Sequence, residues 1–283
     1  MEEPASAFVM VGGLRLHYLT WGAASAPPLL LLHGLGESAH AWMPVALRLA
    51  EHFRVLALDL RGHGDSDWHE TYAMQEIGDD AGEMIGVLGL GQAVVAGIGL
   101  GGRAAALLAA RQEHTVERLI VIEAGVHMNL PAEHAADLAV FNLPRRYNAP
   151  EEYGVAWNAM RGRLGLRLRD DALGAATAER VRAEVRAIST GGFAPKCDLD
   201  GYAEYRRWSP GERVVDYDDE FHEINAPTLV VRGSHSPLLP PEEASATVAA
   251  IAGARLVTIE DAAHDILVDN LAGLAAAMLD FLL

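Results

Sequence analysis

Residues 29–36 read Leu-Leu-Leu-Leu-His-Gly-Leu-Gly, a run of large apolar side chains that stops at a glycine-rich turn. A short apolar run bounded by turn residues is typical of a buried strand. A second such run, Val55–Leu58, leads into the polar segment 59–66, which reads Asp-Leu-Arg-Gly-His-Gly-Asp-Ser. Parallel sheets bind ligands at the carboxyl ends of their strands. We therefore expect both turns to face one site.

Similar runs recur along the chain and alternate with segments of helical spacing. The further expected strands are Ala93–Ala96, Leu119–Ile122, Thr228–Val231 and Arg255–Ile259. The expected helices are Trp42–Glu51, Tyr72–Leu88, Gly102–Arg111 and Pro241–Ile251. Such alternation is typical of a sheet covered by helices on both faces. The sequence predicts an α/β fold with a mostly parallel central sheet.

The alternation stops between about Met128 and Glu223, where no strand-like run occurs and helical stretches dominate. This interval is too long for a structureless loop. We expect a helical insertion, or cap, over 128–223, inserted into an α/β core formed by 1–127 and 224–283. The insertion carries an arginine cluster, interpreted either as a solvated helix face or as a source of one ligand for an anionic substrate: Arg161, Arg163, Arg167 and Arg169.

Composition narrows the class of partner. The 283 residues carry a formal net charge of −17, so nucleic acid would be repelled and a polybasic membrane-binding face is not expected. Cys197 is the only cysteine, which excludes an intrachain disulfide or a cysteine-based zinc site. The acidic start of the chain does not resemble a secretion signal, and no long uncharged apolar run follows. We expect a cytoplasmic protein whose partner is a small-molecule substrate.

Segments 33–36 and 59–66 together resemble two motifs of the alpha/beta-hydrolase superfamily, its HGxG-like oxyanion loop and its D-x-R-G-x-G-x-S turn. The resemblance extends to 93–102, where the family has its nucleophile elbow, and to 261–265, which looks like its histidine loop. It spans nearly the whole chain outside the insertion. It implies that His264 is a general base and that a few residues near the first loop and the elbow meet the substrate. These are the N–H groups of Leu35 and Leu100 as an oxyanion hole, and His33 and Gly34 as substrate-binding residues.

The chain departs from the family pattern at two positions. The elbow, expected as G-x-S-x-G, reads Gly-Ile-Gly-Leu-Gly-Gly over 97–102, so the nucleophile position holds Gly99 and no acyl-enzyme can form there. The loop 234–237, where many members carry a catalytic Asp, reads Ser-His-Ser-Pro. Some members take their acid from the end of the preceding core strand, and Glu123 occupies that place. Glu123 is therefore expected to orient His264 and stabilise its imidazolium.

These residues predict an enzyme, a hydrolase or lyase, that acts on a small, largely apolar carbonyl compound such as an ester, lactone or diketone. The reaction would proceed without a covalent serine intermediate and without a cofactor. His264 could activate a water for direct attack, or the same groups could stabilise an enolate. The sequence does not choose between these two reactions.

Three other interpretations stay open at this stage. Gly97, Gly99 and Gly102 fit G-x-G-x-x-G between a strand and a helix, with Glu123 ending the next strand, as in a dinucleotide site. The chain could instead be a non-catalytic ligand-binding descendant of the fold. It could also be a serine hydrolase inactivated by replacement of its serine with glycine.

Overall fold

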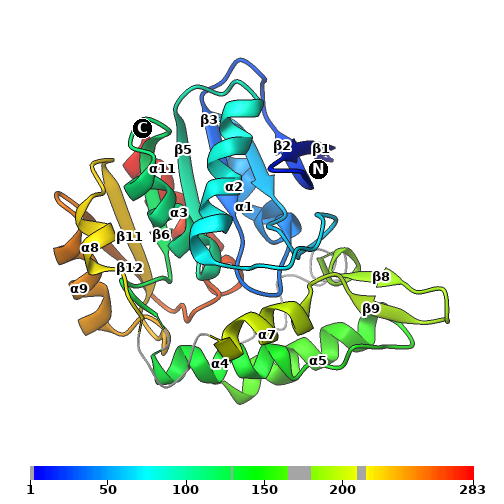
Figure 1. The fold of residues 1–283 in the computed structure, drawn as a ribbon. Coiled ribbons are helices and arrows are strands. Elements are labelled where there is room, and N and C mark those ends of the chain that lie inside the picture. The colour runs from blue at the N-terminus through cyan, green and yellow to red at the C-terminus, as the bar shows by residue number, and fades with distance from the viewer. Residues whose placement is uncertain (1–2, 129, 165–179, 209–214) are drawn as a thin grey trace.

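The computed structural model describes residues 3–128, 130–164, 180–208 and 215–283. In this part of the chain an eight-stranded sheet has the order β1-β2-β4-β3-β5-β6-β11-β12 (Figure 1). The strands are β1 (Ala5–Val11), β2 (Leu14–Trp21), β3 (Pro28–Leu32), β4 (Arg54–Leu58), β5 (Ala93–Ile98), β6 (Val116–Ile122), β11 (Thr228–Gly233) and β12 (Arg255–Ile259). All six predicted strands are present and pair in parallel, which confirms the predicted fold class.

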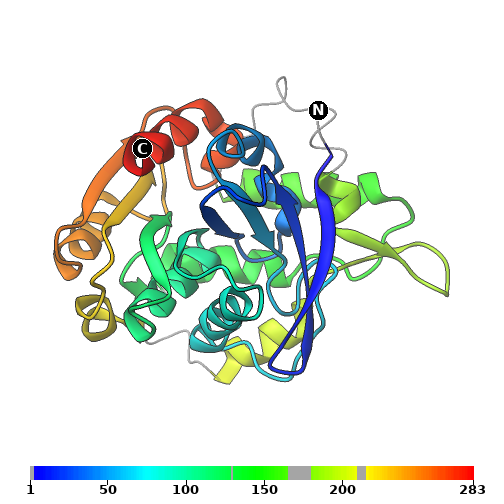
Figure 2. The same ribbon diagram turned by 90° about the horizontal axis from the view of Figure 1, so that it is seen from above.

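The sheet begins with an antiparallel hairpin that the sequence analysis did not predict. β1 pairs with β2, and β2 pairs antiparallel with β4. Viewed from above, this hairpin lies at one edge of the sheet and β12 at the other (Figure 2). Gly12 and Gly13 both have positive φ and form the two-residue turn between the strands. A Gly-Gly pair between two extended segments is a hairpin signal, and it was available in the sequence.

Helices cover both faces, and the leucine run of β3 shows why. Leu29 and Leu31 belong to the core formed with α1 (Met43–Leu49) and α11 (Leu271–Leu282). Leu30 and Leu32 belong to the opposite core, formed with α2 (Met74–Val87) and α3 (Leu100–Arg111). Alternate side chains of a strand point to opposite faces, and all four leucines are fully buried. A continuous apolar run is what a strand buried on both faces requires.

The described part of the chain between β6 and β11 is mainly helical, and most of it lies below the sheet in Figure 1. Its described elements are β7 (His127–Met128), α4 (Pro131–Phe141), α5 (Pro150–Arg163), β8 (Val185–Ala187), β9 (Phe193–Pro195), α7 (Leu199–Trp208), β10 (Val215–Asp216) and α8 (Asp218–His222). The expectation that this interval holds no strands is wrong. β7 pairs with β10 and β8 with β9, but strands of two or three residues leave no detectable apolar run.

Two further helices complete the fold near the carboxyl end of the chain. They are α9 (Pro241–Ala250) and α10 (Ile266–Asp269); α8 packs against both α3 and α9. In the ranges given above, no helix combines the length and apolar character needed to cross a bilayer. The division into a separate cap over 128–223 stays a prediction.

Candidate active site

The turn between β5 and α3 has a sharply bent backbone centred on Gly99. Gly99 has φ 53° and ψ −114° and immediately precedes the first residue of α3. The strand and helix approach so closely that a Cβ on Gly97 would lie 2.2 Å from the carbonyl oxygen of Gly101. Glycine at 97 is therefore a packing requirement. The result is a strand-turn-helix that presents position 99 at the carboxyl edge of the sheet.

Position 99 faces His264. A Cβ built on Gly99 would lie 3.6 Å from both Cε1 and Nε2 of the His264 ring. These are ordinary van der Waals distances. Apart from the two chain neighbours of Gly99, no other described residue has a heavy atom within 4 Å of this Cβ. The sequence-predicted elbow and histidine loop therefore meet, and a small side chain at position 99 would point at the imidazole.

Glu123 holds the other side of the His264 ring. Glu123 Oε2 lies 3.0 Å from His264 Nδ1, as expected from the place of Glu123 at the end of β6. Its φ is 52°, a left-handed conformation that disfavours a residue with a side chain by about 1–2 kcal/mol. Strain of this kind often marks functional sites. Burial alone disfavours a charged imidazole, but the hydrogen bond and charge of Glu123 outweigh it and raise the pKa of His264.

Ser236 and Gly233 fix the Glu123 carboxylate. The backbone N–H of Gly233 donates to Oε1 at 2.6 Å, and the Ser236 hydroxyl donates to Oε2. The Glu123 side chain is fully buried. From the sequence, Ser236 was only one residue of a loop that lacks the expected Asp. In the structure this loop supplies a hydrogen bond to the acid where many relatives of the fold supply the acid itself.

The backbone N–H groups of Leu35 and Leu100 lie near position 99, and neither is paired within the part of the chain that the structure describes. In the loop after β3, the N–H of Gly34 donates to Glu37, that of Gly36 to His63, and that of Glu37 to the Gly34 carbonyl. The N–H of Leu35 has no hydrogen-bond partner among the described residues, and neither has that of Leu100 at the start of α3. These are the two donors that the resemblance implied.

His33 does not fill the role expected of it. It is fully buried, its Nε2 accepts from the Leu60 N–H at 3.0 Å, and its Nδ1 donates to the Gly34 carbonyl at 2.8 Å. Its ring does not line the cavity, whereas Gly34 does. We therefore correct the expectation of a substrate contact for the His33 side chain. Burial lowers the pKa of His33, so the ring stays neutral and joins two loops.

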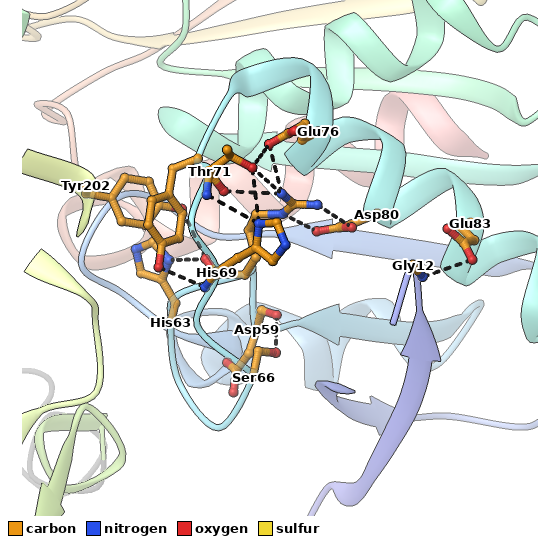
Figure 3. Close-up of polar contacts among 12 residues, drawn as sticks. Gly12, Asp59, His63, Ser66, His69, Thr71, Glu76, Asp80, Glu83 and Tyr202 are labelled. Carbon is orange, nitrogen blue, oxygen red and sulfur yellow. Dashed lines mark hydrogen bonds and ion pairs between the residues drawn. The ribbon is translucent and has the colours of Figure 1, made fainter. Parts of the chain in front are cut away.

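His63 joins the same loops from the other side. Its Nε2 accepts from Gly36 at 3.0 Å and its Nδ1 donates to the carbonyl of Arg61. Burial, together with His33, lowers the pKa of His63 to about 3. The ring packs edge-on against Tyr202 of α7, as Figure 3 shows.

The turn 59–66 is built around Asp59, which lies beside Ser66 in Figure 3. Asp59 accepts from the N–H groups of Ala39 and Asp65 and from His17 Nδ1 at 2.7 Å. His17, Asp59 and Asp65 place possible ligand atoms within 4.8 Å of one another. Because Asp59 already accepts these hydrogen bonds, we interpret the group as structural support for the turn.

The cavity beside His264 has a volume of about 110 Å³. It lies between the strand ends and the helical insertion, and residues of both contribute to its wall. The apolar part of the wall includes Leu35, Met74, Ile98, Val140, Trp157 and Met160. The charged part includes Glu37, Arg103, Glu133, Asp137, Arg161 and Asp265, in addition to Glu123 and His264.

The arginine cluster of the insertion divides between cavity and solvent. Arg161 is 5% exposed, lines the cavity and is paired with Asp265. Arg163 is exposed. Arg167 and Arg169 lie outside the described residues. The pairing with Asp265 was not predicted, because the two residues are 104 positions apart.

The dinucleotide interpretation fails on Glu123. In that interpretation the acid must hydrogen-bond a ribose hydroxyl. Here the Glu123 carboxylate is buried and already engaged by His264, Ser236 and Gly233. Gly102 packs against the backbone of β5, where a Cβ would lie 2.8 Å from the Gly97 carbonyl oxygen. The glycines therefore serve the tight turn and packing of the elbow.

Comparison with known proteins agrees with this architecture. Residues 27–271 match the family model described as the alpha/beta hydrolase fold. The chain belongs to the alpha/beta hydrolase family. The match covers the first strand-end loop, the elbow and the histidine loop, so the sequence resemblance is confirmed.

Individual relatives point to hydrolases. The chain is 29% identical over 233 residues to 2-(acetamidomethylene)succinate hydrolase of Mesorhizobium japonicum, a match that covers 82% of this chain and 78% of that protein. A crystal structure of E-2-(acetamidomethylene)succinate hydrolase superposes with a TM-score of 0.85 at 23% identity, covering 99% of each chain. The enol-lactonase of Burkholderia xenovorans superposes with a TM-score of 0.71 at 25% identity, covering 98% of this chain and 99% of that one. The protein is an alpha/beta-fold hydrolase.

Proposed function

We propose that this hydrolase cleaves a small carbonyl compound by direct attack of water, with His264 as general base and without an acyl-enzyme. One observation carries the proposal. Position 99 faces Nε2 of a histidine whose Nδ1 is held by a buried carboxylate, yet position 99 has no side chain. A base of this kind needs a proton donor within reach, and a water molecule can take the place of the serine hydroxyl.

The groups around position 99 suit each step of such a hydrolysis. His264 Nε2 takes a proton as the water oxygen bonds to the carbonyl carbon, and Glu123 stabilises the imidazolium. The N–H groups of Leu35 and Leu100 would donate to the carbonyl oxygen as it becomes negatively charged. The bond to the leaving group then breaks, and His264 returns the proton to the departing atom.

The relatives support the choice of hydrolysis over enolate chemistry. Their names describe a hydrolase of 2-(acetamidomethylene)succinate and an enol-lactonase. Both named activities cleave a small molecule with water. We extend to this chain only that class of reaction, on a compound small enough for a cavity of about 110 Å³.

Several expectations accompany this proposal. The helical insertion 128–223 would act as a cap that selects the substrate, since α4 and α5 contribute cavity residues. No nucleic-acid partner is proposed, because the net charge is −17. The single cysteine supports a reducing compartment, and we propose a cytoplasmic location.

Turnover of a panel of aryl esters and small lactones tests the proposal. We expect His264→Ala to lower kcat/KM about 10²–10⁴-fold, the usual contribution of a general base. His235→Ala is the matched control, because His235 lies exposed in the neighbouring loop, and it should leave the rate unchanged.

Three outcomes would contradict the proposal. Turnover that survives in His264→Ala would show that another group is the base. A panel member that binds without any product in the wild type would favour the ligand-binding descendant. If Gly99→Ser raised turnover a hundredfold or more, the chain would instead be an inactivated serine hydrolase.

A further inference from the structure

Arg161 has a buried edge that no described residue satisfies. Its Nη1 pairs with Asp265, whereas Nε and Nη2 are both buried and have no hydrogen-bond partner among the residues that the structure describes. The side chain is 5% exposed and lines the cavity together with His264. Leaving buried N–H groups of a charged side chain unpaired is unfavourable. An acceptor on a bound ligand would satisfy them.

The unpaired atoms form a fork with a defined preference. Nε and Nη2 lie on one edge of the planar guanidinium, and this edge matches the two oxygens of a carboxylate. Elsewhere in the same chain, Arg61 uses this edge to bind Asp80, which lies on α2. Arg61 donates from Nε to Asp80 Oδ2 at 2.7 Å and from Nη2 to Oδ1 at 2.8 Å. In Arg61 the edge is occupied by a protein carboxylate, whereas in Arg161 it is free.

We propose that the Nε–Nη2 edge of Arg161 binds the carboxylate of a small organic acid in the cavity. That this acid is the substrate, with its reacting carbonyl beside His264, rests on the proposed function. The binding itself does not. The expected ligand is therefore a carboxylic acid with a largely apolar skeleton. The sequence predicted a small, largely apolar carbonyl compound, and this proposal adds a carboxylate to it.

The charges around Arg161 permit a bound anion. Arg161 faces Asp265, and Arg180 pairs with Glu37 and lies 3.9 Å from Asp265. Burial raises the pKa of nearby Glu184 to about 8, so this carboxyl is mostly neutral at pH 7. Two arginines thus face two carboxylates, and each carboxylate takes part in an ion pair. Asp265 Oδ1 has no hydrogen-bond partner among the described residues, but a ligand carboxylate would bind the Nε–Nη2 edge, which is a different edge of the guanidinium from the Nη1 that pairs with Asp265.

The rest of the wall suits the carbon skeleton of such an acid. Leu35, Val140, Trp157 and Met160 line the same cavity as Arg161 and His264. An acid held at Arg161 can therefore reach toward position 99 across apolar side chains. Trp157 also provides an intrinsic fluorescence reporter within the cavity.

Binding of benzoate and of benzamide tests this inference without requiring turnover. The two probes have nearly the same shape, but only benzoate carries a carboxylate. We expect wild-type protein to bind benzoate about tenfold or more tightly than benzamide, as measured by tryptophan fluorescence and calorimetry. Arg161→Gln should bind the two probes equally within about twofold.

Two further variants keep the test decisive. Arg161→Lys retains the charge that faces Asp265 but lacks the two parallel N–H groups of the guanidinium edge. It should therefore also lose most of the preference for benzoate over benzamide. This variant decides the outcome if Arg161→Gln does not fold. Arg163→Gln is the matched control, on the same helix and exposed, and should keep the wild-type preference. A wild type without the preference, or either Arg161 variant that retains it in full, would overturn the inference. If His264→Ala loses turnover but still binds benzoate, both proposals stand. If the wild-type protein binds benzoate but turns over no substrate, only the proposed function is refuted.

Discussion

At the scale of single residues, Gly99 decides what chemistry the site can perform. The backbone at position 99 has the conformation of a nucleophile elbow, with φ 53°, and the nearest side chain is the His264 ring. Lack of space does not explain the glycine at position 99, because a Cβ there would make only ordinary van der Waals contacts. Position 99 offers no hydroxyl, whereas His264 and Glu123, the proposed base and its acid, lie beside it.

The pH dependence of turnover should report on His264. Glu123 raises the pKa of His264 against the opposing effect of burial. A general base must be neutral, so kcat/KM should fall on the acid side with a midpoint above the ordinary value of 6.5. Glu123→Gln removes the charge that stabilises the imidazolium, so its midpoint should lie lower than in the wild type.

Initial rates from about pH 5 to about pH 9 measure both midpoints. His235→Ala should leave the wild-type midpoint in place, because this exposed ring is not part of the site. An unchanged midpoint in Glu123→Gln would show that the carboxylate does not act through the imidazole.

Sequence alone could identify the residues that stand in motifs. Gly99, Glu123 and His264 each occupy a strand-end position of a known pattern, and the structure brings them together. Ser236 and Arg161 could not be assigned, because their roles depend on side chains more than 100 positions away. Contacts between side chains so far apart in the sequence depend on the tertiary structure and cannot be predicted from local sequence spacing.

At the scale of elements, two neutral histidines lock the strand-end loops together. His33 accepts from Leu60, and His63 accepts from Gly36. Each ring therefore connects the loop after β3 to the turn after β4. These hydrogen bonds hold the loop that carries the Leu35 N–H. The same two histidines therefore support both the stability of the fold and the proposed oxyanion contact.

Removing the His63 ring should destabilise the fold. His63→Ala leaves a cavity and an unpaired buried Gly36 N–H, and we expect the free energy of unfolding to fall by about 2–4 kcal/mol. Chemical denaturation measures this change. The exposed His52 provides a control, and His52→Ala should leave stability within about 0.5 kcal/mol of the wild type.

The same variant should change the acid sensitivity of the fold. Between pH 6.5 and about 3 the unfolded chain protonates at His63 while the folded protein does not, so wild-type stability falls as the pH falls. His63→Ala should lose less stability over this window. An equal slope in the two proteins would show that His63 is not held neutral in the fold.

The elements that sequence could predict are those with a continuous buried face. Runs such as Leu29–Leu32 are fully buried on both sides of the sheet. Because both faces must be apolar, such a strand can be recognised in the sequence as a continuous apolar run. β8 and β9 have only three residues each, and their pairing depends on a turn at Gly191 and Gly192. Short strands with little burial leave no apolar pattern.

At the scale of the whole molecule, the candidate active site is formed by residues from several layers of the fold. The sheet supplies position 99 and Glu123, the loop after β12 supplies His264, and the helical insertion supplies Arg161 and Trp157. The fold class could be predicted from the alternation of strands and helices. The cavity wall could not, because the facing side of each insertion helix is set by packing that one sequence does not reveal.

Mass spectrometry of the intact protein, quenched during turnover of an ester substrate, tests most directly whether the hydrolase works without a covalent intermediate. We expect wild-type protein to release product while its mass stays that of the unmodified chain. An acyl adduct on a cavity residue of the wild type, formed and lost in step with turnover, would contradict direct attack by water.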